Sequence, residues 1–298
     1  MTDILSLLRC PVCGGELVRA DRSLRCAAGH AYDLARAGYV NLLPPGKQKN
    51  ARTGDEDAMV RARTAFLARG FYDPIDTLTA DSLAAYGRTG GGERIFADLG
   101  AGEGWHTCRT AELLGARAGV PVLGLGFDAS KFAAESACRL ARSKGFFDRD
   151  AIGGGFEAPV RAACLPANIF RLPVPDGVFH AALSMFAPVP WEEARRILSP
   201  GGLLAVVSAG REHLYELRSA LYDEVRLADR VPEPPAELGF AEKARLPLRF
   251  VFEPGESLPD LFGMTPFSRK TGAEGRTRLL SRTDMKITAS VLLSLFEV

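Results

Sequence analysis

Residues 94–119 read RIFADLGAGEGWHTCRTAELLGARAG: an apolar run, a glycine-rich turn and then an amphipathic segment. The apolar run predicts a strand over Arg94–Leu99, and the segment after the turn predicts a helix over about Glu103–Leu114. Residues 120–145 repeat this pattern, with a strand that runs to Phe127 and a second helix. Strands that alternate with helices at this spacing predict an α/β fold with a parallel sheet, whose ligand crevice lies at the carboxyl ends of the strands.

The turn itself indicates which cofactor the crevice holds. Its glycines are Gly100, Gly102 and Gly104, a G-x-G-x-G pattern, whereas dinucleotide-binding folds carry G-x-G-x-x-G. The pattern resembles the first motif of S-adenosylmethionine-dependent methyltransferases. This cofactor has no phosphate, so the glycines need only let the backbone approach it closely. Asp98 suits its ammonium and sulfonium charges, and Asp128, after the second strand, is placed to accept hydrogen bonds from both ribose hydroxyls.

A third stretch, residues 166–188 (PANIFRLPVPDGVFHAALSMFAP), adds the adenine side of the predicted pocket. In methyltransferases of this class a polar residue five positions before the proline of an LP pair borders the adenine, and Asn168 has that place relative to Pro173. A strand then leads to the loop that faces the substrate. The predicted cofactor-binding set is Asp98, Gly100, Gly102, Glu103, Gly104, Trp105, His106, Asp128 and Asn168.

Three of the six cysteines and one of the four histidines lie within the first thirty residues. Cys10 and Cys13 form one close pair and Cys26 and His30 a second, which suits a tetrahedral zinc site closed by four protein ligands. The sequences ELVRA and SLRC between the pairs predict a short hairpin. A disulfide is disfavoured by the reducing compartment we expect, and a catalytic zinc by the lack of an open coordination position. The other cysteines are expected to be small buried hydrophobic residues: Cys108, Cys138 and Cys164.

The composition bounds the class of protein. With 298 residues, 47% hydrophobic and 24% charged, the chain is long enough for one large and one small domain. Because no apolar run approaches the roughly 20 residues that span a bilayer, and no signal-peptide cleavage site follows the acidic start, we expect a cytoplasmic protein without a membrane partner. Residues 1–72 hold 11 Lys and Arg against 7 Asp and Glu, a weak basic bias.

The chain as a whole resembles one family, the bacterial 23S ribosomal RNA (guanine-N1)-methyltransferases. The matching segments follow the zinc cluster: YDLARAGYVNLL, GDEDAMVRARTAFLARGFYDP, DLGAGEGWHT, GFDASKFA, RLPVPDGVFHAALSMFAP, REHLYELRSALYDEV and LFGMTPF. The resemblance implies a zinc-binding RNA-recognition domain (1–36), a linker and helical segment (37–92), and a Rossmann-like methyltransferase domain (93–298). It also implies S-adenosylmethionine and Zn²⁺ as cofactors, a homodimer, and methylation of guanine N1 in a 23S rRNA hairpin.

The chain departs from the family pattern at three places. Ala101 replaces the usual cysteine at the centre of the glycine motif, which is a harmless change beside a small ligand. Family members generally have an aspartate near the position of His180. Because His180 lies in the middle of a predicted strand, packing or a core hydrogen bond would explain a histidine there. Residues 146–158 (FFDRDAIGGGFEA) are longer than the family pattern and are expected to form a surface loop.

The catalytic residues are not identified by the sequence, and three remain candidates. Phe186 and Pro188 follow the substrate-side strand, where they either wall an extruded guanine or cap the strand. His213 lies at the start of a predicted helix and either takes a proton, contacts RNA or caps the helix.

The stretch between the two modules has an open interpretation as well. In residues 46–57 the basic Lys47, Lys49 and Arg52 either meet phosphates or belong to a solvated linker. The following MVRARTAFLARGFY predicts an amphipathic helix in which Phe66 and Leu67 are core residues. Two rival functions stay open: methylation of another RNA, a protein or a small molecule, and RNA binding without catalysis.

Overall fold

The computed structural model describes residues 1–43, 57–87, 91–225, 227, 231–282 and 284–298. The predicted phosphate contacts Lys47, Lys49 and Arg52 therefore lie outside the described residues. Within the described ranges, no helix is both long enough and apolar enough to cross a membrane.

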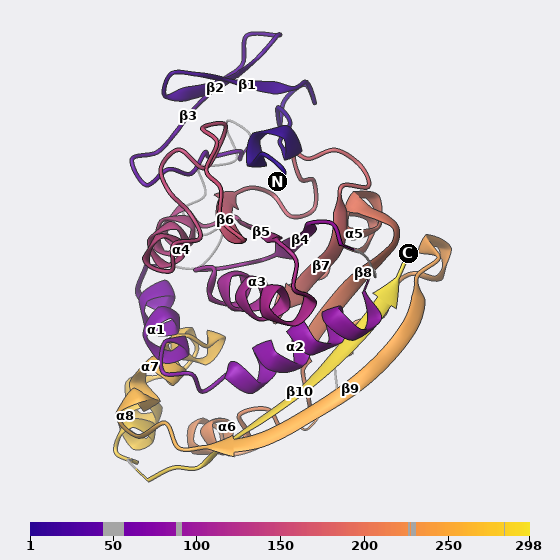
Figure 1. The fold of residues 1–298 in the computed structure, drawn as a ribbon. Coiled ribbons are helices and arrows are strands. Elements are labelled where there is room, and N and C mark those ends of the chain that lie inside the picture. Colours follow the sequence, from indigo (N-terminus) through magenta and orange to yellow (C-terminus); the bar gives the residue numbers. More distant parts are fainter. Residues whose placement is uncertain (44–56, 88–90, 226, 228–230, 283) are drawn as a thin grey trace.

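A mixed seven-stranded sheet forms the centre of the described chain, in the order β6-β5-β4-β7-β8-β10-β9 (Figure 1). The first five strands in this order are parallel and the last two are antiparallel to their neighbours. Their bounds are β4 Arg94–Leu99, β5 Val122–Asp128, β6 Val160–Pro166, β7 Phe179–Met185, β8 Leu198–Ala209, β9 Ala241–Phe252 and β10 Ile287–Glu297. The predicted Rossmann-like parallel sheet is confirmed; the antiparallel pair β9–β10 was not predicted.

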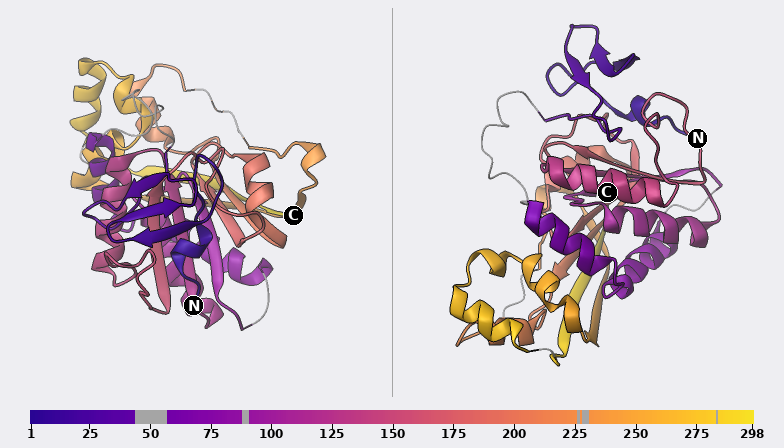
Figure 2. Two further views of the ribbon diagram at one scale, coloured as in Figure 1. Left: turned by 90° about the horizontal axis from the view of Figure 1, so that it is seen from above. Right: turned by 90° about the vertical axis from the view of Figure 1, so that its left-hand side faces the viewer.

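The helices cover both faces of this sheet (Figures 1 and 2). Helices α3 and α4 each pack on β5 and β6, α2 packs on α3, and α1 packs on α4. The bounds are α1 Asp57–Leu67, α2 Asp73–Tyr86, α3 Trp105–Ala118, α4 Lys131–Ser143, α5 Trp191–Ile197, α6 Tyr215–Leu221, α7 Leu258–Gly263 and α8 Ala273–Leu280. Helix α3 begins two residues later than predicted because Gly104 precedes it in the left-handed conformation. Phe66 and Leu67 on α1 are fully buried, as predicted.

The N-terminal module is a three-stranded antiparallel sheet, β1 Leu17–Ala20, β2 Ser23–Cys26 and β3 Ala31–Asp33, preceded by a 3-10 turn over Ile4–Leu7. The hairpin of β1 and β2 is the predicted one, and β3 is an addition. The module packs on the main sheet, because its Ile4 and Leu8 share one buried cluster with Ile95 and Leu123. The first residues also contact the main domain, since the Thr2 N–H donates to the Glu93 carboxylate at 2.6 Å.

Residues 146–158 are irregular, as predicted, but they are more than a surface loop. Ala151 and Ile152 are buried, and the Asp150 carboxylate pairs with Arg19 of the zinc module at 2.6 Å. Arg19 also donates to the Ile152 carbonyl at 3.0 Å. The segment therefore fastens the zinc module to the main domain.

Two smaller predictions about polar core groups are confirmed. In β7 the His180 Nδ1 accepts a hydrogen bond from the Ile95 N–H at 3.0 Å, which is the core role expected for it. Cys108, Cys138 and Cys164 are buried, and burial raises the pKa of the first two thiols to about 12. These thiols stay protonated and act as small apolar side chains.

Candidate functional site

The glycine turn between β4 and α3 has a backbone that other residues fit poorly. Gly100, Gly102 and Gly104 have φ angles of 92°, 55° and 75°, in the left-handed region. Space is also lacking, because a Cβ at Gly100 would lie 2.6 Å from the Ala187 Cβ and one at Gly102 would lie 2.8 Å from the Arg63 Nη2. The turn is therefore shaped for close approach of backbone to its surroundings, as the motif predicts.

Asp128, the last residue of β5, holds this turn in place. Its Oδ2 accepts a hydrogen bond from the Gly102 N–H at 3.1 Å, and its Oδ1 accepts one from the Ser130 N–H at 2.8 Å. A carboxylate accepts several hydrogen bonds at once, so this group also has the chemistry to accept from hydroxyl groups of a ligand. Asp128 thus connects the end of β5 to the glycine turn that follows β4.

A cavity of about 500 Å³ lies at the carboxyl ends of the parallel strands, beside this turn. This volume is within the range of small-molecule sites. Eight of the predicted residues line it: Gly100, Gly102, Glu103, His106, Asp128, Asn168, Phe186 and Pro188. Asp98, Gly104, Trp105 and His213 are outside the lining, so the predicted set is divided between the wall of the cavity and the layer behind it.

Asp98 lies beneath the turn rather than in the cavity wall. It is buried in β4, and its Oδ2 accepts a hydrogen bond from the Thr107 hydroxyl at 2.6 Å. Burial raises the pKa of Asp98 to about 6, against the opposing hydrogen bond from Thr107. Asp98 therefore connects the strand to helix α3 in this conformation. Gly104 has a related packing role, because a Cβ there would come within 2.8 Å of the Ala137 Cβ on α4.

Two ion pairs beside the cavity each include one residue, Arg63 or Asp76, that the sequence analysis did not identify. Arg63 on α1 pairs with Glu103, whose side chain is almost fully buried. Asp76 on α2 is fully buried and its Oδ1 contacts the His106 Nδ1 at 2.6 Å. Both partners come from helices upstream of the glycine motif, so no local spacing links them to it. Arg63 did stand in a segment that carries the family resemblance, but without a stated role.

The ion pair with Asp76 keeps the His106 imidazole charged beside the cavity. Burial alone lowers the pKa of His106, but the charge and hydrogen bond of Asp76, together with Glu103 and Asp98, outweigh it and raise the pKa to about 9. His106 is therefore protonated at neutral pH. His106 and Arg63 both line the cavity, paired with Asp76 and Glu103, and cationic N–H donors of this kind suit a carboxylate group of a ligand.

This charge gives a prediction for stability against pH. A pKa raised from 6.5 to about 9 contributes folding stability that is complete below pH 6.5 and is lost as the pH rises through 9. The contribution is on the order of 3 kcal/mol. We expect urea unfolding to show a larger loss of stability between pH 6.5 and pH 9.5 in the wild type than in His106→Gln. Equal losses in both proteins would show that the ion pair does not form in solution.

The substrate-side rim is formed by aromatic side chains. Phe186, directly after β7, has a φ of 54°, an unusual angle for a bulky residue, and is 42% exposed. Its ring stacks on His213 at a centroid distance of 5.4 Å and an angle of 29°, and Tyr72 lies 6.2 Å away. A stored strain of this kind is expected where a side chain must be presented to a ligand.

His213 is held behind Phe186. Burial, with the nearby Arg218 charge, lowers the pKa of His213 to about 4, so the ring is neutral. Its Nδ1 accepts a hydrogen bond from the Ser290 N–H at 3.3 Å, and its Nε2 lies 3.4 Å from the Tyr72 hydroxyl. Because Nδ1 accepts, the proton of the neutral ring is on Nε2. Both nitrogens are engaged, which favours a positioning role over proton transfer.

The four predicted zinc ligands come together in the N-terminal module. The sulfur atoms of Cys10, Cys13 and Cys26 and the Nδ1 of His30 all lie within 4.8 Å of one another. The distance from Cys13 Sγ to Cys26 Sγ is 3.7 Å, and those from His30 Nδ1 to Cys10 and Cys26 Sγ are 3.5 and 3.3 Å. A tetrahedron with Zn–S bonds of about 2.3 Å has edges of about 3.8 Å. The donor set therefore fits a structural zinc ion.

A tyrosine supports this cluster from inside the module. The Tyr32 hydroxyl, in β3, lies 3.1 Å from the Cys10 Sγ. A hydroxyl that donates to a ligating thiolate orients it, as neighbours of metal ligands commonly do. This contact explains the buried position of a polar ring in so small a sheet.

Comparisons with known proteins show which proteins this chain is similar to. The family model described as "RlmA, N-terminal", a zinc ribbon, matches residues 8–52. The 23S rRNA (guanine(748)-N(1))-methyltransferase of Streptomyces fradiae is 36% identical over 256 residues, which are 83% of this chain and 81% of that protein. A Micromonospora griseorubida protein, provisionally named a 23S rRNA (guanine-N(1)-)-methyltransferase, is 38% identical over 72% of this chain and 70% of its own length. Among solved structures, the YcgJ protein of Bacillus subtilis is 16% identical with a TM-score of 0.46, covering 73% of this chain and 97% of that one.

Proposed function

The chain belongs to the family of 23S rRNA (guanine-N1)-methyltransferases, and on this premise we propose how its residues transfer a methyl group to N1 of a guanine in a 23S rRNA hairpin. S-Adenosylmethionine, when bound, supplies a methyl group already activated by the sulfonium. The contribution of the protein is then alignment of the donor with guanine N1. The observation that carries the proposal is the carboxylate of Asp128, which holds the glycine turn at a cavity of suitable size.

Different residues of the cavity would bind different parts of the donor. Asp128 accepts from the two ribose hydroxyls, and Asn168 borders the adenine. The charged His106 and Arg63 bind the carboxylate of the methionine part, while Glu103 beside them favours its ammonium. Gly100 and Gly102 allow the chain to approach without a side chain in between. This arrangement leaves Phe186 and Pro188, which also line the cavity, for the guanine.

Phe186 is the residue we propose to stack on the target base. It projects at the substrate-side rim with a strained backbone, and the neutral His213 keeps its ring in place. A base extruded from a hairpin loses its stacking, and an aromatic ring recovers part of it. His213 thereby acts as a positioning residue.

Removal of this ring gives a prediction for the reaction. Because stacking of one base on an aromatic ring contributes about 1–3 kcal/mol, we expect Phe186→Ala to lower kcat/KM for RNA by about tenfold to a hundredfold. Donor affinity should change little, and Phe186→Tyr should restore most of the activity. Steady-state kinetics on 23S rRNA and calorimetry with the donor measure these effects. A normal kcat/KM in Phe186→Ala would remove the stacking role.

The proposed reaction is tested by incubating the protein with labelled S-adenosylmethionine and unmodified 23S rRNA. Label in the RNA, with a reverse-transcriptase stop at one guanine, is the expected result, because a methyl group on N1 blocks base pairing. Label in protein or metabolite fractions instead would favour another substrate. Absence of donor binding by calorimetry would favour the non-catalytic RNA-binding alternative. The same stop identifies which guanine is modified.

Two further parts of the proposal concern assembly and location. We infer a homodimer, which is supported by β9, a long strand at the edge of the sheet formed by the described residues. Light scattering tests the homodimer, for which we expect a mass of twice 32.0 kDa.

We place the reaction in the cytoplasm because ribosomal RNA is its substrate. Fractionation of cells that express the protein tests this location.

A further inference from the structure

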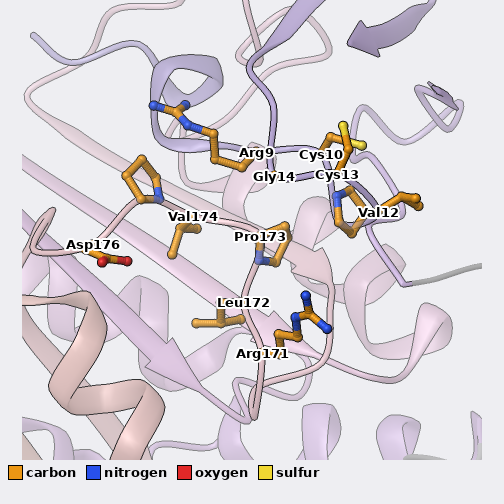
Figure 3. Close-up of a pocket in the computed structure, with 12 residues that line it drawn as sticks. Arg9, Cys10, Val12, Cys13, Gly14, Arg171, Leu172, Pro173, Val174 and Asp176 are labelled. Carbon is orange, nitrogen blue, oxygen red and sulfur yellow. The ribbon is translucent and has the colours of Figure 1, made fainter. Parts of the chain in front are cut away.

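A groove separates the zinc knuckle from the loop that follows β6. One wall consists of residues 9–14 of the knuckle and the other of residues 171–176, and the groove has a volume of about 380 Å³ (Figure 3). The groove borders the metal site: Cys10 and Cys13 line it, whereas Cys26 and His30 do not. Nothing described so far uses this groove.

Both walls are held in fixed positions. The Arg9 N–H donates to the Pro173 carbonyl at 2.7 Å, which joins the walls at the base of the groove. Behind the second wall, Arg196 of α5 donates to the carbonyls of Leu172 and Val174 at 3.1 and 2.9 Å. The Leu172 N–H in turn donates to Glu193 at 2.5 Å. The groove is therefore a preformed site rather than a gap between loose loops.

The groove carries positive charge that none of the described residues neutralises. Arg171 is exposed, and none of the described residues forms an ion pair or hydrogen bond with its guanidinium. Figure 3 shows this guanidinium directed across the groove toward the knuckle. The Arg9 guanidinium donates to the Ser6 and Leu8 carbonyls, at 3.1 and 2.8 Å, which fixes its charge nearby, and no acid in the described part of the chain forms an ion pair with it. The acid of the groove, Asp176, is already paired with Arg196 at 2.6 Å.

Apolar groups stand beside this charge. Val12 of the knuckle is 48% exposed in the groove, opposite the buried Pro173. Phe170, directly before Arg171, is 60% exposed and lines the donor cavity. An exposed aromatic ring next to an arginine is the combination with which proteins hold single-stranded nucleic acid, one group for a base and the other for a phosphate.

One loop connects the groove to the donor cavity. Residues 167–170 line the cavity and residues 171–176 line the groove. Since consecutive Cα atoms are about 3.8 Å apart, Phe170 and Arg171 place the two sites within reach of one dinucleotide. An RNA strand that delivers its guanine to the donor would thus pass Arg171 with a neighbouring phosphate.

We propose that this groove binds a backbone phosphate next to the target guanine, with Arg171 as the ligand and Phe170 stacking on an adjacent base. The inference rests on the proposed function and adds a binding site to it. The zinc knuckle then forms one wall of the substrate site, and its metal keeps that wall at a fixed distance from the donor. Arg171 positions RNA and takes no part in donor binding.

The test compares Arg171→Ala with Arg276→Ala, an exposed arginine on α8, at the opposite end of the molecule from the zinc module (Figures 1 and 2). Binding of a 23S rRNA fragment that contains the mapped guanine is measured as a function of salt. We expect Arg171→Ala to weaken binding about tenfold and to reduce the slope of log K against log salt by about 0.7–0.9, the loss of one phosphate contact. Arg171→Lys should keep the wild-type slope, and Arg276→Ala should match the wild type.

A second arm locates the phosphate. The same fragment is made with single uncharged methylphosphonate linkages at successive positions around the guanine. One linkage next to the guanine should weaken binding by the wild type and leave binding by Arg171→Ala unchanged. If no linkage distinguishes the two proteins, or if Arg171→Ala binds like Arg276→Ala, the groove is not a phosphate site. These results are separable from failure of the proposed function, in which the wild type itself neither binds donor nor labels RNA.

Discussion

Replacement of Asp128 by alanine is expected to weaken binding of S-adenosylmethionine by a hundredfold or more. The carboxylate would accept from both ribose hydroxyls, and hydrogen bonds to a charged group contribute about 1.5–3 kcal/mol each, so the loss is at least about 3 kcal/mol. The variant also releases the Gly102 N–H, which the Asp128 Oδ2 holds at 3.1 Å. The glycine turn then loses its connection to β5.

Two variants separate these contributions. Asp128→Asn retains one acceptor oxygen and removes the charge, so its donor affinity should lie between the wild type and Asp128→Ala. Ser130→Ala removes the N-cap hydroxyl that accepts from the Ala133 N–H, and it should lower stability without a comparable effect on the donor. Isothermal titration calorimetry gives the affinities, and thermal unfolding gives the stabilities. Unchanged donor affinity in Asp128→Ala would end its assignment as the ribose acceptor.

The parts of the fold that sequence reasoning predicted well are those with local causes. The bounds of β4 and the end of β5 follow from apolar runs that stop at a glycine turn and at an acidic residue. The Cys10, Cys13, Cys26 and His30 cluster follows from ligand spacing, which needs only a short hairpin to bring the pairs together. In both cases the decisive interactions lie within about thirty residues of chain.

The missed features depend on packing between distant segments. Asp98 was predicted among the donor-binding residues; in the structure the alternation along β4 points it with Phe96 toward helix α3, where Thr107 donates to it, and the sequence did not indicate this contact. Asp76 is buried against His106 from a helix thirty residues upstream. Nothing in the pattern of α2 distinguishes this aspartate from a surface residue until the position of α3 is known.

The same reasoning explains the loop at residues 146–158. Its glycines and charges are typical of an exposed loop, and much of it is exposed. However, Asp150 pairs with Arg19, and Gly153 donates its N–H to Asp3 at 3.2 Å, so its function is to hold the zinc module. Because the partners of Asp150 and Gly153 lie more than a hundred residues away in the sequence, the local pattern does not predict these contacts.

Loss of zinc is the second large effect that we expect. Cys10→Ser should reduce the zinc content from one ion per chain to nearly none, because a hydroxyl is a poor replacement for a thiolate and Cys10 is buried at the cluster. A structural zinc ion contributes roughly 10 kcal/mol or more to the order of so small a module. The knuckle should therefore unravel, and kcat/KM for 23S rRNA should fall more than a hundredfold.

Donor binding is the informative control for this variant. The cavity is built by residues of the main domain, and helices α3 and α4 cover their face of the sheet without the zinc module. We expect donor affinity to stay within about threefold of the wild type and, since Ile4 and Leu8 pack on the sheet, the melting temperature to fall by several degrees. Metal analysis, calorimetry and RNA kinetics on Cys10→Ser, with Cys108→Ser as the matched cysteine control, provide the comparison. If donor and RNA binding are lost to the same extent, the metal serves the whole fold, and the knuckle has no separate part in holding RNA.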